Sequence, residues 1–520
     1  MTELSHKKIL ILDCQTTGMH PSTGQLLQIG WSLFDPTSLP VPDIQKRTLK
    51  LNEELIPNKI KKMLHLTATD LEHSTESHKV FNQLQQALNE LGAEPIVIAH
   101  YAQFEKSFLK QFYLEHAQTD ELNFKLFCSQ KIAKRLLPQL PSHNLKAIAG
   151  YYKWPSTPKN EILSHVSMTV YVWQQLLPQL HAANVSCYSS LERWLARKPS
   201  EKNVHRYEYN IERLDRLNLS VKPGIYRMLA EDGTILYIGK ATSLKARVNS
   251  YFRGVKNRDR RKLEMLAQVW DIQTIECDTP LEAALLESDE IKKWSPPYNV
   301  LLTLERPSLI FYNREYTELS KLRDSTYLNG PHKPQDALSW LMELIHALKN
   351  HEAMNYGEEH LSAEQLKNAW HLFLTTHHFE HVILQQHGIR SCLVMGYTLL
   401  KQFERTYGKG TFQKWWANEK KQNPEEELSL EERIARKMAR ICLRAAEARR
   451  KSKMISRLYN STLMIQSSQK RITVVNGALL NSNSMPSETK EPPAFELYHY
   501  DRLSILLSAL NNKTVTLISA

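Results

Sequence analysis

A set of residues between positions 226 and 299 combines side chains that could hydrolyse a phosphodiester bond. The set is Tyr226, Tyr237, Lys240, Arg247, Tyr251, Glu287 and Asn299. Phosphoryl transfer needs an attacking oxygen, a positive group on the phosphate and usually a metal ion at the leaving oxygen. A lone carboxylate suits one divalent ion that keeps several waters. Each residue taken singly could be an ordinary strand aromatic or a solvated helix residue, but the ordered set favours a nuclease site.

A hairpin and a helix are expected to position the first part of this set. The apolar runs 224–229 and 234–239 flank Ala230 to Gly233. The Asp-Gly pair within that connection is a strong signal for a β-hairpin. A helix should follow, with Thr242 or Ser243 as its cap. Arg247 and Tyr251 are four positions apart, so they should share one face of that helix.

A second helix should carry the only glutamate of the set. Thr279 and Glu282 have the spacing of a capping box, and Pro280 occupies the first helical position, where proline is tolerated. Glu287 lies on this helix. The pattern therefore places the carboxylate on an element separate from the hairpin.

Residues 223–303 resemble the GIY-YIG nuclease domain of the UvrC and Cho excinucleases, through Gly224-Ile225-Tyr226 and Tyr237-Ile238-Gly239. The resemblance implies that Tyr237 acts as general base, helped by Lys240. It also implies that Arg247 steadies the scissile phosphate.

The same resemblance implies roles for the remaining residues of the set. Glu287 would bind a single Mg²⁺ or Mn²⁺ ion, Tyr226 and Tyr251 would orient groups in the site, and Asn299 matches the closing asparagine of the family. The family often continues with Asp-Asp-Lys, whereas this chain reads Thr303 to Pro307 as TLERP. That departure concerns the surface after the domain and leaves the catalytic set intact.

A second, damaged set of catalytic positions lies nearer the N-terminus. A strand is expected at 8–12, followed by Asp13 and Gln15, and Glu105 and His165 come later. Residues 7–180 resemble the DnaQ-like 3′–5′ exonucleases, which use four acidic residues and a histidine. In the corresponding positions this chain has Asp13, Gln15, Glu105 and Val170, with His165 kept. Two divalent ions need several carboxylates, so the resemblance implies the fold with a degenerate site.

Composition and charge agree with a protein that binds nucleic acid. The chain has 520 residues, a formal net charge of +12 and six scattered cysteines without a Cys-x-x-Cys pair. A basic balance favours a polyanionic partner. The length allows two or three domains, and the cysteine pattern indicates a reducing compartment. Since no apolar run approaches 18 residues, a cytoplasmic location without membrane contact is expected.

The C-terminal region contains a candidate DNA-binding helix. Ser429 and Glu432 have the spacing of a capping box and open a predicted helix over 429–458. Basic residues form a stripe along it at Arg433, Lys437, Arg440 and Arg444. Such a stripe could contact phosphates or could simply be a solvated face. Both interpretations stay open at this point.

The sequence thus predicts a multidomain α/β and α+β protein. An RNase H-like exonuclease fold over 1–185 precedes a linker over 186–222, a GIY-YIG domain over 223–305 and a basic mixed α/β region over 306–520. The expected function is incision of damaged DNA on the 3′ side of a lesion, with UvrA and UvrB as partners. One alternative is an active 3′–5′ exonuclease with an accessory GIY-YIG domain. Another is a non-catalytic protein that binds nucleic acid.

Overall fold

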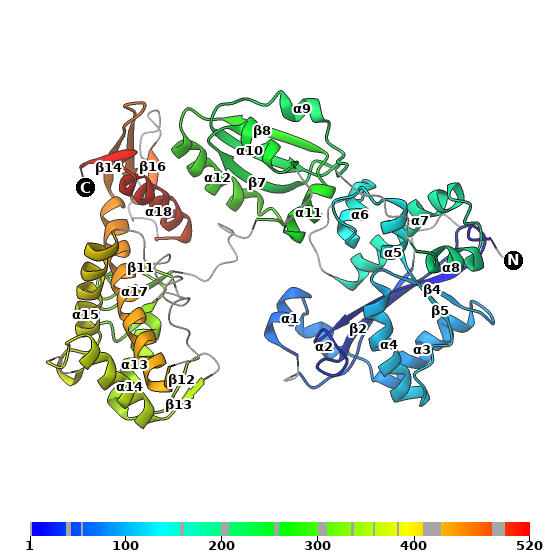
Figure 1. The fold of residues 1–520 in the computed structure, drawn as a ribbon, viewed down its shortest axis with the longest axis horizontal. Coiled ribbons are helices and arrows are strands. Elements are labelled where there is room, and N and C mark those ends of the chain that lie inside the picture. The colour runs from blue at the N-terminus through cyan, green and yellow to red at the C-terminus, as the bar shows by residue number, and fades with distance from the viewer. Residues whose placement is uncertain are drawn as a thin grey trace. The chain divides into compact units, whose positions relative to one another are not determined.

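The computed structural model divides the chain into two compact units, which are described separately. One unit comprises Met1–Ala283 and Trp294–Leu301, and the other comprises Ala284–Lys293 and Leu302–Ala520. The structure describes residues 3–37, 43–53, 56–155, 161–198, 207–253, 259–299, 309–333, 337–356, 359–381, 384–408, 428–480 and 495–519. The ribbon in Figure 1 labels many of their elements.

The N-terminal part of the first unit is built on a five-stranded mixed sheet. Its strands are β1 (Ile9–Thr16), β2 (Leu26–Phe34), β3 (Ile44–Thr48), β4 (Ile96–Ala99) and β5 (Lys125–Cys128). Their order is β3-β2-β1-β4-β5, and β4 and β5 run parallel to β1 and to each other while β1, β2 and β3 pair antiparallel. The strand predicted at 8–12 corresponds to β1, which continues through Asp13 and Gln15 to Thr16.

Helices cover both faces of this sheet. They are α1 (Asn58–Met63), α2 (Ala68–Glu72), α3 (Ser77–Asn89), α4 (Ala102–Ala117), α5 (Ser129–Leu136), α6 (Leu145–Tyr151), α7 (Ile162–Ala182) and α8 (Tyr188–Ala196). Alternate residues of β1 enter two cores, because successive strand side chains point to opposite faces. Ile9 and Ile11 pack with α5 to α8, whereas Leu10 and Leu12 pack with α3 and α4.

Helix α8 lies within the segment predicted as a linker. Its Tyr188 and Leu191 are buried in the same core as Ile9 and Ile11. Residues 188–196 are therefore packed against the exonuclease-like fold and do not form a linker.

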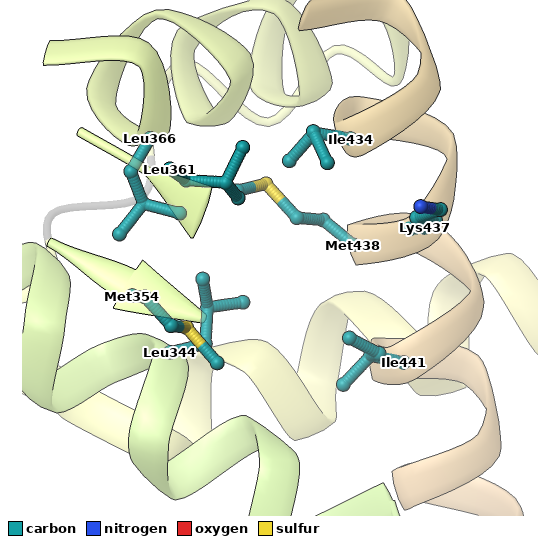
Figure 2. Close-up of a pocket in the computed structure, with 8 residues that line it drawn as sticks. All are labelled: Leu344, Met354, Leu361, Leu366, Ile434, Lys437, Met438 and Ile441. Atoms are coloured by element: carbon teal, nitrogen blue, oxygen red, sulfur yellow. The ribbon is translucent and has the colours of Figure 1, made fainter. Parts of the chain in front are cut away.

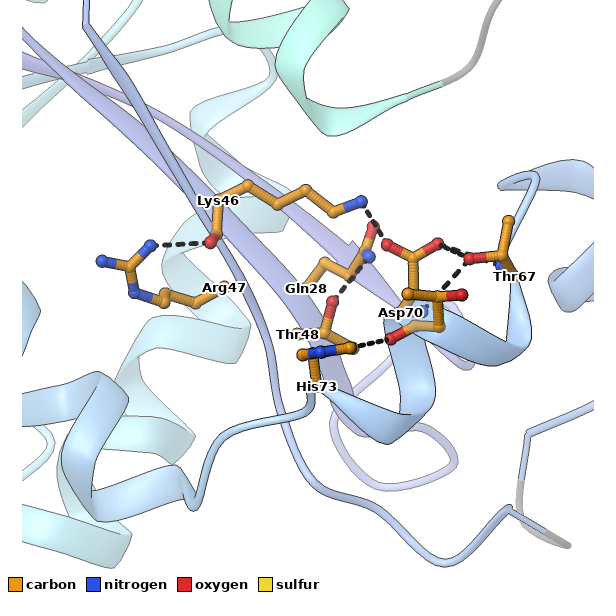
Figure 3. A network of polar contacts seen from close by, with 8 residues as sticks. Gln28, Lys46, Arg47, Thr48, Thr67, Asp70 and His73 are labelled. Carbon is orange, nitrogen blue, oxygen red and sulfur yellow. Dashed lines mark hydrogen bonds and ion pairs between the residues drawn. The ribbon is translucent and has the colours of Figure 1, made fainter.

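A polar network ties α2 to the edge of the sheet (Figure 3). Lys46 on β3 contacts the Asp70 carboxylate at 2.6 Å, and Asp70 also completes a capping box with Thr67. Beside it, Gln28 of β2 donates to Thr48 of β3 through a buried hydrogen bond of 2.9 Å. The network fixes the short helix at the outer strand.

The second part of the first unit is a small antiparallel sheet with helices. Its elements are α9 (Arg213–Leu217), β6 (Gly224–Leu229), β7 (Ile235–Ala241), α10 (Leu244–Ser250), α11 (Arg260–Ala267) and β8 (Asp271–Glu276). The strand order is β7-β6-β8. The predicted hairpin joins β6 to β7, with Gly233 at a positive φ of 81°. Ser243 caps α10 by accepting from the Ala246 amide, as one of the two predicted caps.

Helix α12 (Pro280–Trp294) follows; its residues Ala284–Lys293 are assigned to the second unit and the others to the first. Its N-terminus has the predicted capping box. The Thr279 and Glu282 side chains each accept from the other residue's amide, both at 3.2 Å. The helix therefore begins where the sequence predicts.

The second unit combines long helices with small sheets. Its helices are α13 (Ala337–Asn350), α14 (Ala363–Thr376), α15 (Leu384–Tyr407), α17 (Leu430–Leu458) and α18 (Leu497–Asn511). Its strands are β9 (Ile310–Tyr312), β10 (Leu319–Ser320), β11 (Asn329–His332), β12 (Met354–Tyr356), β13 (Glu359–Leu361), β14 (Ser461–Ile465), β15 (Arg471–Val475), β16 (Ala478–Leu480) and β17 (Val515–Ser519). They form sheets of order β10-β9-β11, β12-β13 and β16-β15-β14-β17.

Helix α17 is the central element of this unit. Helices α13, α14 and α15 pack against it, and it also contacts β11 and α18. Ser429 and Glu432 form the predicted capping box at its start. Ile434, Met438 and Ile441 are buried in the core beneath it. Among the described residues, no helix has both the length and the apolar character needed to cross a membrane.

Candidate active site

Three tyrosines of the predicted set meet between β6, β7 and α10. The hydroxyl oxygens of Tyr226 and Tyr251 lie 2.9 Å apart. The Tyr237 ring centroid lies 6.1 Å from that of Tyr226 and 6.3 Å from that of Tyr251. Tyr226 is fully buried, whereas Tyr237 is half-buried. Burial, followed by the neighbouring Tyr251 and Tyr237, raises the pKa of Tyr226, so this phenol stays neutral and can only exchange hydrogen bonds.

Gly239 explains how Tyr226 fits against the neighbouring strand. The two residues are direct partners in the antiparallel register of β6 and β7. A Cβ atom at position 239 would overlap the Tyr226 hydroxyl and would lie 2.9 Å from Cε1 of Tyr237. Only a residue without a side chain leaves room for both rings. The sequence motif contains this glycine. Its role, which is to leave room for the Tyr226 ring, becomes evident only from the register of the two strands.

Two basic residues flank the cluster. The Arg247 guanidinium carbon lies 5.3 Å from the centre of the Tyr251 ring, in the range of a cation–π contact. This contact joins the two residues that the sequence places four positions apart. Lys240 is exposed at the end of β7, three positions after Tyr237. Both side chains are therefore accessible to an anionic ligand.

Asn299 holds the strand that carries Tyr237. Its side-chain oxygen accepts from the Ile238 amide at 2.9 Å, and its side-chain nitrogen donates to the Ile238 carbonyl at 2.9 Å. Strand β7 is at the edge of the sheet, so these backbone groups face away from β6. The asparagine amide thus makes the two hydrogen bonds that a neighbouring strand would otherwise make to Ile238.

Glu287 lies on α12 and is half-buried. It belongs to Ala284–Lys293, the part of this helix that clusters with the second unit. The structure therefore brings together Tyr226, Tyr237, Arg247, Tyr251 and Asn299, and the position of Glu287 beside them stays a prediction. Within the described ranges, no group of three or more His, Cys, Asp or Glu side chains could form a metal site.

Two ion pairs bind α12 to α18 within the second unit. Lys292 lies 3.1 Å from the Asp501 carboxylate, and the two side chains are only 6% and 3% exposed. Arg502 donates from two nitrogens to the two oxygens of Asp289, one of them at 2.8 Å. Lys333 is a further cation, 3.7 Å from Asp501. The helix that carries Glu287 is thus fixed to the C-terminal region by charged contacts that sequence reasoning missed, because the partners are more than 200 positions apart.

The exonuclease-like site retains a carboxylate and a histidine in contact. Asp13 Oδ2 at the centre of the sheet lies 3.3 Å from His165 Nδ1 on α7. Glu105 on α4 is 3% exposed, and its Oε2 has no hydrogen-bond partner among the described residues. Burial and the charge of Asp13 raise the pKa of Glu105 well above its usual range.

The other two positions of this site supply no charge. Gln15 is buried on β1 next to Cys14. Val170 is buried in the apolar core with the residues of α7 around it. The structure therefore brings Asp13, His165 and Glu105 together. At the two positions where the DnaQ-like family has further carboxylates, this chain has the amide of Gln15 and the isopropyl group of Val170.

The basic stripe on α17 is less exposed than a solvated face would be. Arg433, Lys437 and Arg440 are half-buried, and Arg444 is exposed. Lys437 lines a small apolar pocket with Ile434, Met438 and Ile441 on one side and residues of α13, α14 and the β12-β13 pair on the other (Figure 2). Its aliphatic stem covers apolar surface, as lysine stems commonly do.

Residues 222–300 match a family model described as the UvrC-like GIY-YIG domain. A domain of this type is a metal-dependent nuclease, so the chain contains an enzyme domain that hydrolyses phosphodiester bonds. The match ends at the residue after Asn299, which agrees with the extent of the cluster described above.

Curated relatives match parts of the chain. A Mycobacterium tuberculosis protein provisionally named as a bifunctional exonuclease/endonuclease is 29% identical over 215 residues, which are 40% of this chain and 32% of that protein. UvrABC system protein C of Psychrobacter cryohalolentis is 44% identical over 115 residues, which are 22% of this chain and 18% of that protein. The matches thus span less than a third of the length of these relatives.

A solved structure also matches. It is the GIY-YIG N-terminal endonuclease domain of UvrC from Thermotoga maritima bound to magnesium, with 32% identity and a TM-score of 0.16. The match covers 17% of this chain and 94% of that domain.

Proposed function

We propose that this chain is a DNA-repair endonuclease that incises damaged DNA on the 3′ side of a lesion during nucleotide excision repair. The proposal rests above all on the cluster of Tyr226, Tyr237 and Tyr251 with Arg247, inside a segment that matches a UvrC-like nuclease domain. Resemblance to UvrC supports UvrA and UvrB as the partners that mark the lesion, and the net charge of +12 supports a DNA substrate.

Tyr226 and Tyr237 have different roles in proton transfer. Tyr226 is buried and neutral and has its hydroxyl hydrogen-bonded to Tyr251, so it orients groups rather than accepts a proton. Tyr237 is half-buried at the edge of the cluster and is assigned as the general base for the attacking water. Lys240, on the same strand, assists Tyr237 in its role as general base. Arg247 holds the scissile phosphate through charge-assisted hydrogen bonds.

The donor set fits a single divalent ion, Mg²⁺ or Mn²⁺. Glu287 is the one carboxylate of the set, and such an ion is commonly held by one or two carboxylates and several waters. Glu287 would hold the ion, which supplies positive charge at the leaving oxygen when bound.

Two other functions are less well supported. Exonuclease activity would rest on Asp13, Glu105 and His165 alone, because Gln15 and Val170 provide no carboxylate. A protein that only binds nucleic acid would not need the ordered set of candidate catalytic side chains around Tyr237. Both alternatives make distinct predictions in a cleavage assay.

Nicking of supercoiled plasmid, with magnesium or with a chelator, tests the enzyme class. The second step uses end-labelled duplex with one lesion, with UvrA and UvrB present or absent. We expect a magnesium-dependent single cut 3′ to the lesion that requires both partners. A ladder of products shortened from the 3′ end would favour the exonuclease, and binding without cleavage would favour the third alternative.

A further inference from the structure

The exonuclease-like fold contacts the GIY-YIG domain through helices α6 and α11, which pack together within the first unit. The Trp270 indole donates to the Gly150 carbonyl at 2.8 Å. Lys153 lies 3.2 Å from the Glu231 carboxylate and 4.9 Å from the centre of the Trp270 ring. These contacts join residues on the two sides of the segment that connects the domains.

Gly150 is the point of closest approach. A Cβ atom there would overlap Cγ of Gln268 and would lie 2.9 Å from its Cβ. Gln268 is 6% exposed and follows the end of α11, so it has little room to move. Glycine in a helix costs stability relative to alanine, and here it allows α6 to lie directly on the Gln268 side chain.

Gln268 links this contact to Tyr298 through a hydrogen bond. Its side-chain nitrogen donates to the Tyr298 hydroxyl at 2.6 Å and to the Glu264 carbonyl at 2.9 Å. The Tyr298 hydroxyl in turn donates to Glu264 Oε1 at 2.7 Å. The other carboxylate oxygen of Glu264 accepts from Asn144 of the exonuclease-like fold at 2.8 Å. Glu264 and Gln268 thus connect one domain to a tyrosine of the other.

Tyr298 directly precedes the residue that holds the strand of the proposed base. Its amide donates to the Leu236 carbonyl at 3.1 Å, and Asn299 pairs with both backbone groups of Ile238. Leu236 and Ile238 are the two neighbours of Tyr237 in the chain. Any displacement of Tyr298 would therefore act on both sides of Tyr237.

We propose that the exonuclease-like domain is a positioning domain for the GIY-YIG site. Helix α6 packs on Gln268 and fixes its side chain, and Gln268 in turn fixes Tyr298 through a hydrogen bond. Tyr298 and Asn299 then fix the backbone around Tyr237. Gly150, Gln268, Glu264 and Tyr298 are positioning residues in this scheme. The inference rests on the proposed nuclease function for its catalytic consequence, but the link to the Ile238 backbone can be measured without activity.

The test uses the full-length chain with Gly150→Ala, with Tyr298→Phe and with both. Alanine favours the helix, and phenylalanine keeps the ring, so both variants should fold. The matched control is Ser167→Ala, at a half-buried position on α7 of the same domain, where the hydroxyl donates only to the Leu163 carbonyl of its own helix among the hydrogen bonds of the described residues. Each variant is assayed for plasmid nicking and for hydrogen exchange of the Ile238 amide, with circular dichroism as the check on folding.

We expect kcat to fall about 10- to 100-fold with KM unchanged in both single variants, because a shift on the ångström scale near the reacting groups has that effect. Exchange of the Ile238 amide should be roughly five to ten times faster, as the weakening of one ordinary hydrogen bond allows. The double variant should be no worse than the poorer single variant, since both act on one path.

Unchanged exchange and unchanged kcat in both single variants would overturn the proposal. So would a double variant whose losses multiply, because that result means two independent effects. If the wild-type chain does not nick DNA but the Ile238 amide exchanges faster in both variants, the proposed function fails and the positioning link stands.

Discussion

The side chain of Asn299 closes a two-hydrogen-bond ring with the backbone of Ile238, at 2.9 Å for each bond. Among the described residues, β7 has no partner strand on this side, so without the amide both backbone groups would be left to hydrogen-bond with water. Ile238 is next to Tyr237, which makes this pairing the closest structural support of the proposed base. Asn299, one residue before the end of the matched segment, therefore holds β7 at a position 61 residues earlier in the chain.

The first prediction separates the two central tyrosines. Tyr237→Phe removes only the hydroxyl assigned as general base and should lower the rate of nicking by about 10²- to 10⁴-fold. Tyr226→Phe removes a hydroxyl that is buried and hydrogen-bonded to Tyr251, and should cause a clearly smaller loss. Single-turnover nicking of supercoiled plasmid measures both rates. A larger loss in Tyr226→Phe than in Tyr237→Phe would reverse the assignment of the base.

Local signals in the sequence predict the elements of the site well. Asp232-Gly233 predicts the hairpin, Ser243 the start of α10, and Thr279 with Glu282 the start of α12. Each of these rests on groups within a few positions of one another, so composition and spacing determine them.

Contacts between distant segments could not be predicted in the same way. The packing of Gln268 against Gly150 requires two helices from different domains to meet. A glycine inside α6 was the only sign of this contact in the sequence. The pair of Lys292 with Asp501 likewise joins charged residues that look like ordinary surface positions. Burial of charge depends on packing, which a single sequence does not reveal.

The second prediction concerns the basic stripe on α17. Replacement of Arg433, Lys437, Arg440 and Arg444 by glutamine should weaken duplex DNA binding and reduce its salt dependence. Each lost phosphate contact lowers the log–log slope of affinity against salt by about 0.9. Fluorescence anisotropy at several salt concentrations measures the slope, and thermal unfolding confirms that the variant is folded. An unchanged slope in a folded variant would show that the stripe serves packing and solvation only.

The third prediction is that the exonuclease-like site is catalytically silent. The full-length Glu287→Gln variant, given an end-labelled single strand with magnesium or manganese, should produce no ladder from the 3′ end. The reason is the loss of carboxylates at Gln15 and Val170, which leaves too little negative charge for two metal ions. A ladder that disappears when Asp13→Ala is added would contradict this prediction.

The fourth prediction concerns the stability of the second unit. Asp501→Leu leaves Lys292 buried without its carboxylate and should destabilise the unit by about 3–5 kcal/mol. Its thermal transition should fall by roughly 10 °C. The matched control is Glu315→Gln, which breaks the exposed pair with Arg390 and should cost at most about 1 kcal/mol. Equal shifts in differential scanning calorimetry would show that burial of the Lys292 pair has no special weight.

The most direct test of the account is the incision rate of Glu287→Gln. An amide of the same shape removes the charge proposed to hold the divalent ion, so the variant should lose magnesium-dependent nicking while its affinity for DNA is kept. Glu276→Gln is the control, because that carboxylate lies in an exposed pair with Lys222 on the same domain and its loss should leave nicking intact. Nicking by Glu287→Gln at the wild-type rate would contradict the assignment of this site.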